Sequence, residues 1–260
     1  MELVASRTRT KSGLPQDGLF IVVGNPKSGK TSFAASFPDS YVLELEPGGG
    51  DRVDGRIHDV ASIQELREIL ALVVKDPSIR TVAIDTVDVL SDWLENEVAK
   101  EFGLDSINET KKGVDGFELW AKYRRKVEAL AAYLRASGKL AILLAHCREA
   151  KLDSSGVLVA PAGINLPGKA GTYIAGQADI IGHAYKRQVG PGTEYFLTFQ
   201  GGPLGNWGSR IDELNDKTLR LPKANPYSAF AAAFESLESE VKKPTKVHEK
   251  PSKAPVGAGR

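Results

Sequence analysis

The chain has 260 residues, 42% of them hydrophobic and 26% charged, and its single cysteine, Cys147, excludes an intramolecular disulfide. No apolar run reaches the roughly 18 residues of a membrane span, and residues 1–18 lack the apolar segment of a secretory signal. The net charge of +1 is uneven, because residues 1–16 and 241–260 are basic and the region between them is net acidic. We therefore expect a cytoplasmic protein without a membrane partner, in which nucleic-acid binding would need a local basic patch or the terminal segments.

From the N-terminus onward, short apolar runs alternate with helical patterns. The apolar runs predict buried strands at residues 19–23, 41–46, 81–86 and 140–145, with an edge strand around 56–58. The helical patterns predict helices at residues 32–37, 62–74, 87–102, 117–136 and 226–240. Residues 161–171 are predicted to be a loop, and residues 178–186 and 194–199 to be an antiparallel β-hairpin. This order favours an α/β fold whose mostly parallel central sheet is flanked by helices and extended by a C-terminal antiparallel hairpin.

The composition also divides the chain into three parts. We expect a flexible arm at residues 1–17, one folded domain at residues 18–240 and a disordered basic tail at residues 241–260. The tail is rich in Lys, Pro, Gly and Ser, and it has too few bulky apolar side chains to order by itself. It either adds non-specific affinity for DNA or keeps the protein soluble.

The stretch GNPKSGKT lies between the first predicted strand and the first predicted helix, and it has the P-loop spacing G-x-x-x-x-G-K-[ST]. Backbone N–H groups of such a turn point at a phosphate, and the following helix adds the positive end of its dipole. We expect Lys30 to reach the β- and γ-phosphates of ATP and the hydroxyl of Thr31 to bind Mg²⁺. The residues expected to hold the nucleotide are Gly24, Asn25, Pro26, Lys27, Ser28, Gly29, Lys30, Thr31 and Ser32.

Asp85 closes the apolar run 82–84, which places its carboxylate at the carboxyl edge of the predicted sheet. Ligands bind at this edge in open α/β sheets, and the P-loop lies there too. We therefore predict that Asp85 holds Mg²⁺ opposite Thr31, in preference to capping the helix that starts near Thr86. Asp88 is interpreted as an acid that favours the first helical turn.

Three further segments, taken with the P-loop, make residues 18–235 resemble the RecA-core ATPases: VLELEPGGG at 42–50, TVAIDTVD at 81–88 and AILLAHCRE at 141–149. Within that class the chain is most similar to phage-encoded P-loop proteins, some of which act in single-strand annealing or recombination. The resemblance implies a RecA-like fold and Mg²⁺-dependent ATP hydrolysis. It also implies single-stranded DNA as the partner and a homo-oligomeric ring or filament in the cytoplasm of a bacterial host.

The resemblance also assigns roles to residues at two strand ends. RecA-like ATPases carry a glutamate at the end of the strand after the P-loop helix, where it polarises the attacking water, and Glu46 matches this position. Glu44, two residues earlier on the same side of the strand, is the alternative. His146 follows the fourth core strand, where these proteins carry a polar residue that senses the γ-phosphate. The next residue, Cys147, is interpreted as a small packed side chain and not as a nucleophile. The expected catalytic residues are Lys30, Glu46, Asp85 and His146.

Contacts with DNA and with a neighbouring subunit are implied by weaker signals. By the resemblance, Lys151 and the loop 161–171 with Lys169 occupy the place of DNA-contacting loops. Lys122–Lys126 is a denser basic cluster, but on a helix it also fits an ordinary solvated face. The candidates for a cation that reaches the γ-phosphate of a neighbouring subunit are Lys186, Arg187 and Arg210.

Two other functions stay open. A non-hydrolysing protein of this type would bind nucleotide only to order an oligomer interface. A small-molecule kinase is less favoured, because the region after the fourth strand is predicted to be hairpin-like and lacks the Arg-rich lid of such kinases.

Overall fold

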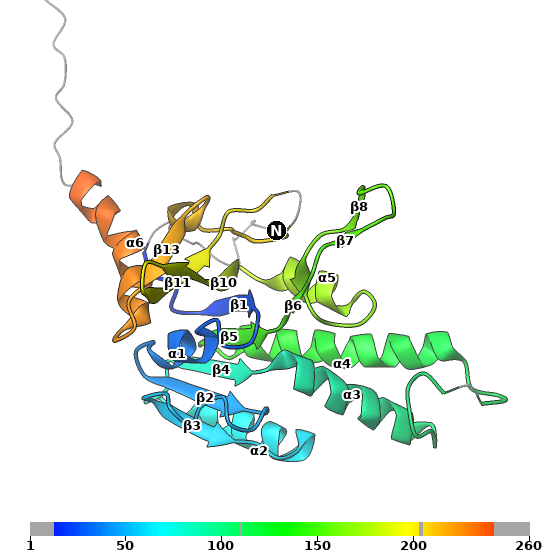
Figure 1. Ribbon diagram of the computed structural model, residues 1–260. Helices are drawn as coiled ribbons and strands as arrows, with labels where there is room; N and C mark the ends of the chain where they lie inside the picture. Colours follow the sequence, from blue (N-terminus) through cyan, green and yellow to red (C-terminus); the bar gives the residue numbers. More distant parts are fainter. Residues whose placement is uncertain (1–12, 110, 203–204, 242–260) are drawn as a thin grey trace, which may run out of the picture.

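A computed structural model describes residues 13–109, 111–202 and 205–241 (Figure 1). Nine strands of this part of the chain form one sheet: β1 (Gly18–Gly24), β2 (Ser40–Glu44), β3 (Arg56–Asp59), β4 (Thr81–Asp85), β5 (Leu140–Ala145), β10 (Ile180–Val189), β11 (Gly192–Thr198), β12 (Gly208–Ser209) and β13 (Thr218–Leu221). Their order is β13-β11-β10-β1-β5-β4-β2-β3, with β12 paired to β10. The six strands from β10 to β3 in this order run parallel, whereas β11, β12 and β13 are antiparallel to their neighbours.

The described part of the chain also forms six α-helices and one 3-10 helix: α1 (Lys30–Ala35), α2 (Ile63–Lys75), α3 (Val87–Glu101), α4 (Gly116–Ala136), α5 (Ala170–Gln177), α6 (Pro226–Val241) and η1 (Asp212–Leu214). Apolar side chains of α2, α3, α4 and α5 pack on one face of the sheet, and those of α1 and α6 pack on the other. The mostly parallel sheet flanked by helices is therefore confirmed. Among the described residues, no helix is both long and apolar enough to cross a membrane.

The predicted antiparallel hairpin is also present, with one difference. Its first strand, β10, pairs in parallel with β1, and Gly24 of β1 lies opposite Ala184 of β10. The strand β10 therefore belongs both to the parallel sheet and to the hairpin. Only β11, β12 and β13 add antiparallel pairing to the sheet. Because β10 continues to Val189, the hairpin extends past the end of β1, where the P-loop begins.

The segment after β5 differs from its prediction. The predicted loop 161–171 contains β9 (Gly163–Ile164) and the start of α5, whose sequence AGTYIAGQ is too rich in small residues to give a helical pattern. β9 pairs with β6 (Cys147–Arg148), while β7 (Lys151–Leu152) and β8 (Leu158–Ala160) form a hairpin that projects from the body (Figure 1). Most of the expected arm, residues 1–17, and of the expected tail, residues 241–260, lies outside the described residues. The structure describes only residues 13–17 of the arm and residue 241 of the tail.

Candidate nucleotide-binding and active site

The P-loop follows β1 without a break and leads directly into α1. An added Cβ at Gly24 would lie 2.4 Å from the carbonyl oxygen of Ala184 and 2.6 Å from Oγ of Ser28, so only glycine fits against β10. Gly29, just before the helix, has a φ of +89°, which is in the left-handed region that glycine adopts without strain. The glycines of the motif thus allow a compact turn whose helix N-terminus faces a cavity.

Lys30 is the first residue of α1, and its ammonium group lies inside the P-loop. Its Nζ donates to the carbonyl oxygens of Gly24 at 2.9 Å and Asn25 at 3.2 Å. Burial lowers the pKa of Lys30, while the carboxylates of Asp85 and Asp88 act in the opposite direction. An ammonium group has three N–H donors, so two protein contacts leave one donor for a phosphate oxygen.

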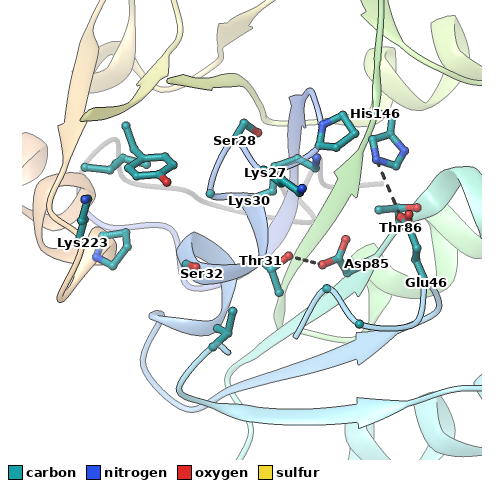
Figure 2. A pocket seen from close by; sticks show the side chains of 18 of the residues that line it. Lys27, Ser28, Lys30, Thr31, Ser32, Glu46, Asp85, Thr86, His146 and Lys223 are labelled. Atoms are coloured by element: carbon teal, nitrogen blue, oxygen red, sulfur yellow. Dashed lines mark hydrogen bonds and ion pairs between the residues drawn. The ribbon is translucent and has the colours of Figure 1, made fainter. Parts of the chain in front are cut away.

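Thr31 and Asp85 meet at the floor of the same cavity (Figure 2). The hydroxyl of Thr31 donates to Oδ2 of Asp85 at 2.6 Å, and Asp85 is only 5% exposed. Burial raises the pKa of Asp85, against the lowering effect of the Thr31 hydrogen bond. A hydroxyl and a carboxylate are hard oxygen ligands, and Mg²⁺ is usually held by one or two carboxylates together with substrate phosphates. The donor set therefore fits Mg²⁺.

The two candidate glutamates have different environments. β2 ends at Glu44, two residues earlier than predicted, and the buried carboxylate of Glu44 accepts a 2.6 Å hydrogen bond from the backbone N–H of Gly50. Burial also raises the pKa of Glu44. Glu46 lies beyond the strand, with a side chain 52% exposed, and it lines the cavity that the P-loop lines. Glu44 therefore closes the turn after β2, and Glu46 is the glutamate that faces the ligand space.

His146 lies across the cavity from the P-loop and is held by Asp88. Its backbone N–H donates to Oδ2 of Asp88 at 2.8 Å, and its ring Nδ1 lies 3.5 Å from the same oxygen. Its Nε2 lies 3.9 Å from Oε2 of Glu46. The interpretation of Asp88 as a helix-start acid misses this contact. Cys147 is half-buried, and burial raises the pKa of its thiol, which disfavours a nucleophilic thiolate.

The cavity has a volume of about 590 Å³ and is lined by residues that the sequence patterns missed. Tyr195 of β11 contributes, and an added Cβ at Gly29 would lie 3.1 Å from its ring. The connection from β13 to α6 supplies further lining residues, among them Lys223 (Figure 2). No local motif marks these positions, because antiparallel pairing far along the chain brings them to the P-loop.

Buried polar atoms without a protein partner lie around this cavity. Oγ of Ser28, Oγ1 of Thr86 and Oδ1 of Asp88 are buried, and none has a hydrogen-bond partner among the described residues. Ser28 and Thr86 also line the cavity. Because buried polar groups in proteins are normally satisfied, these atoms are available to a polar ligand or its ordered water.

The basic residues that the sequence suggested for contacts with DNA or a neighbouring subunit are either paired with acids of the same chain or lie outside the cavity. Three residues of the α4 cluster, Lys122, Arg124 and Lys126, form ion pairs with Glu101, Glu128 and Glu97 of the same chain, which agrees with an ordinary solvated face. Arg210 pairs with Asp179. The described residues that line the cavity include none of Lys151, Lys169, Lys186, Arg187 and Arg210.

Residues 19–211, which run from the P-loop strand to beyond β12, match the AAA domain family. The chain belongs to this family. The matched region contains the P-loop, Glu46, Asp85 and His146, so this AAA domain is a P-loop protein of the nucleotide-binding ATPase type.

Among solved structures, this AAA domain is similar to a KaiC-like protein, PH0186, from the hyperthermophilic archaeon Pyrococcus horikoshii OT3. The two chains are 13% identical, with a TM-score of 0.46, and the match covers 81% of this chain and 87% of the other. The comparison with curated proteins gave no match.

Proposed function

We propose that the protein binds Mg²⁺ and ATP between the P-loop and Asp85 and hydrolyses the nucleotide. The observation that carries this proposal is the 2.6 Å contact between Thr31 and Asp85 at the floor of a P-loop cavity that Glu46 also lines. A phosphate cradle, a pair of metal ligands and an accessible carboxylate are the groups that in-line attack of water on a γ-phosphate requires.

Each side chain has a distinct role in this reaction. Lys30 places a cation at the β- and γ-phosphates, and Mg²⁺, when bound, supplies Lewis-acid neutralisation of phosphate charge. Glu46 aligns the attacking water and accepts its proton, since its carboxylate is free of the turn that occupies Glu44. His146 presents Nε2 on the same side of the cavity as Glu46, where it can donate a hydrogen bond to a γ-phosphate oxygen.

Three variants test this assignment. Lys30→Ala should weaken nucleotide binding roughly 10- to 100-fold, because a charged hydrogen-bond donor to phosphate is lost. Glu46→Gln should keep nucleotide binding and lower the hydrolysis rate on the order of 10²- to 10⁴-fold. Glu44→Gln is the matched control, and it should mainly affect stability. Titration with a fluorescent ATP analogue and a phosphate-release assay measure both properties, and normal hydrolysis by Glu46→Gln would show that Glu46 is not the water-aligning group.

We further propose that the protein acts on single-stranded DNA as a homo-oligomer, in phage recombination or replication. The support is the resemblance to phage-encoded RecA-core proteins and the position of β6 and the projecting β7–β8 hairpin, which follow His146 directly in the chain. A residue that contacts a γ-phosphate at the base of a protruding segment can transmit the nucleotide state to it.

Measuring ATP turnover with and without single-stranded DNA tests this part of the proposal. Turnover stimulated by DNA supports it. Tight ATP binding without turnover would instead favour a nucleotide-dependent assembly protein, and phosphate transfer to a small acceptor would favour a kinase.

A further inference from the structure

One face of the β10–β11 hairpin, together with Trp207 just before β12, carries a row of ring side chains, which we call the aromatic row: Trp207, His183, Tyr185 and Phe196. The rings of Trp207 and His183 are stacked, with centroids 4.4 Å apart and planes 14° apart. Tyr185 lies 5.7 Å from His183 and stacks on Phe196 at 5.3 Å and 16°. The guanidinium of Arg187 lies 5.0 Å from the centroid of Tyr185 and continues the row.

The strand register explains why these side chains share one face. Tyr185 is directly opposite Phe196, and His183 and Arg187 lie two residues to either side of Tyr185 along β10. Side chains alternate between the two faces of a strand, so these residues point to the same side of the sheet. The sequence separates them by up to 24 positions, which explains why a search for clustered aromatic and basic residues finds no signal.

The opposite face of the same hairpin touches the nucleotide site. Tyr195, the neighbour of Phe196, lines the P-loop cavity beside Gly29. Ala184, the neighbour of Tyr185, places its carbonyl oxygen against Gly24. One hairpin therefore has a nucleotide-facing side and an aromatic side, and the two sides are joined through single peptide units.

A second connection links the aromatic row to the segment after His146. Asn206, which precedes Trp207, donates its backbone N–H to the carbonyl oxygen of Ala162 at 3.2 Å. Ala162 lies immediately before β9, and β9 pairs with β6 just after His146. The backbone that carries the row is thus linked to the P-loop strand through the pairing of β10 with β1, and to the segment after His146 through the Asn206–Ala162 hydrogen bond.

The row is accessible and amphipathic. All four rings are partly exposed, Arg187 is exposed, and Arg187 makes no ion pair with any described residue. Glu194 lies directly opposite Arg187 in the hairpin and pairs with Arg220, so these three side chains together leave one net positive charge on this face. Exposed rings beside a net positive charge suit a polyanion that carries flat, unstacked groups, such as the bases of a single strand.

We propose that the aromatic row is a binding surface for single-stranded DNA, with bases stacking on its rings and Arg187 contacting the backbone. Aromatic side chains beside cations bind single strands in this way with little sequence preference. A duplex is a poor fit, because its bases are already stacked inside. The inference rests on the proposed action on DNA and assigns that action to a specific surface.

The experiment measures fluorescence anisotropy of a labelled oligo-dT of about 20 nucleotides on the full chain, with Mg²⁺ and a non-hydrolysable ATP analogue. An oligonucleotide of equal length with abasic sites serves as the second probe. Arg187→Gln and Phe196→Leu should each weaken oligo-dT binding on the order of tenfold. Lys75→Gln is the control, because it removes the same charge at an exposed position of α2, which follows β3 at the far edge of the sheet, and it should change binding less than twofold.

Oligo-dT should also bind more tightly than the abasic strand, because only the former offers rings to stack. Contacts made by the basic terminal segments would not distinguish the two probes, since both carry the same phosphates. Equal binding of the two probes, or unchanged affinity in both Arg187→Gln and Phe196→Leu, would overturn the assignment of the row. Absence of any DNA binding by the unaltered chain would instead overturn the proposed partner, and ATP-analogue binding measured in parallel keeps the two failures apart.

Discussion

Asp85→Asn should stabilise the nucleotide-free protein and remove most of its stabilisation by Mg²⁺ and ATP. Asp85 is 5% exposed, and burial raises the pKa of its carboxyl despite the hydrogen bond from Thr31 and the nearby charge of Lys30. The raised pKa means that ionised Asp85 opposes folding, because the native state binds its proton more tightly than the unfolded state does. Asparagine keeps the shape of the side chain and removes the charge.

The sign of the pH dependence follows from the same shift. The contribution of Asp85 to stability falls as pH rises from the unfolded pKa of about 3.9 through the higher native pKa, and the loss is complete above it. Asp85→Asn lacks this decline. At neutral pH we expect a gain on the order of 1 kcal/mol for the nucleotide-free variant, or roughly 2–4 °C in thermal midpoint.

In the presence of Mg²⁺ and nucleotide, the substitution should instead make the protein less stable than the unaltered one. Nucleotide and Mg²⁺ at about 100 times the dissociation constant should stabilise the unaltered protein by roughly 2.7 kcal/mol, which corresponds to about 5–10 °C. Removing a metal ligand should eliminate most of this shift. Thermal melts with and without ATP, in Mg²⁺ and in EDTA, provide the four measurements. A nucleotide-free variant that melts well below the unaltered protein, or an equal Mg²⁺-dependent shift in both proteins, would refute the reasoning.

Three further predictions concern positions around the site and away from it. Gly24→Ala should weaken nucleotide binding and lower stability by about 1–3 kcal/mol, because its Cβ would lie 2.4 Å from a backbone oxygen of β10; binding titrations and denaturant melts measure this. Asp88→Asn should lower kcat with little change in KM, because the carboxylate positions His146 and the hydrolysis rate depends on that position. Asp179→Ala should cost about 1–3 kcal/mol while leaving nucleotide binding unchanged, because Asp179 accepts hydrogen bonds from Arg135 and the backbone of β1 at the edge remote from the P-loop.

The prediction for Asp88→Asn has a matched control. Asp92→Asn removes the same charge one helical turn beyond Asp88, at an exposed position, and should leave kcat unchanged. Equal kcat losses in Asp88→Asn and Asp92→Asn would contradict a positioning role and favour a general effect of charge. For Asp179→Ala, a loss of nucleotide affinity in the folded protein would contradict the separation between the stabilising cluster and the site.

The phosphate-binding half of the site was predictable from the sequence because it is local. The P-loop spacing, the strand before it and the helix after it are all contained in about 20 consecutive residues, and in the structure Lys30 and Thr31 begin α1 and line the cavity. Asp85 was predictable because a continuous apolar run ending in an acid predicts the carboxyl end of a buried strand. The α/β class followed from the same alternation of runs.

The remaining assignments depended on distances that no local pattern contains. The sequence left Glu44 and Glu46 as alternatives, and only the turn at Gly50 showed that Glu44 is engaged and Glu46 faces the cavity. From the sequence, Asp88 was interpreted only as an acid at the start of a helix. In the folded chain it accepts a hydrogen bond from the backbone of His146, 58 residues away.

The part of the cavity lined by Tyr195, and the aromatic row, were the features least predictable from the sequence. Tyr195 reaches the P-loop, and Phe196 joins His183 and Trp207, only because β10 pairs in parallel with β1 and antiparallel with β11. Backbone pairing across long separations is decided by the burial of whole sheet faces, which is a property of the packed chain. The sequence by itself thus determined that this chain has a P-loop between a buried strand and a helix, and the tertiary structure decided which side chains surround that loop and what lies on the other side of the hairpin.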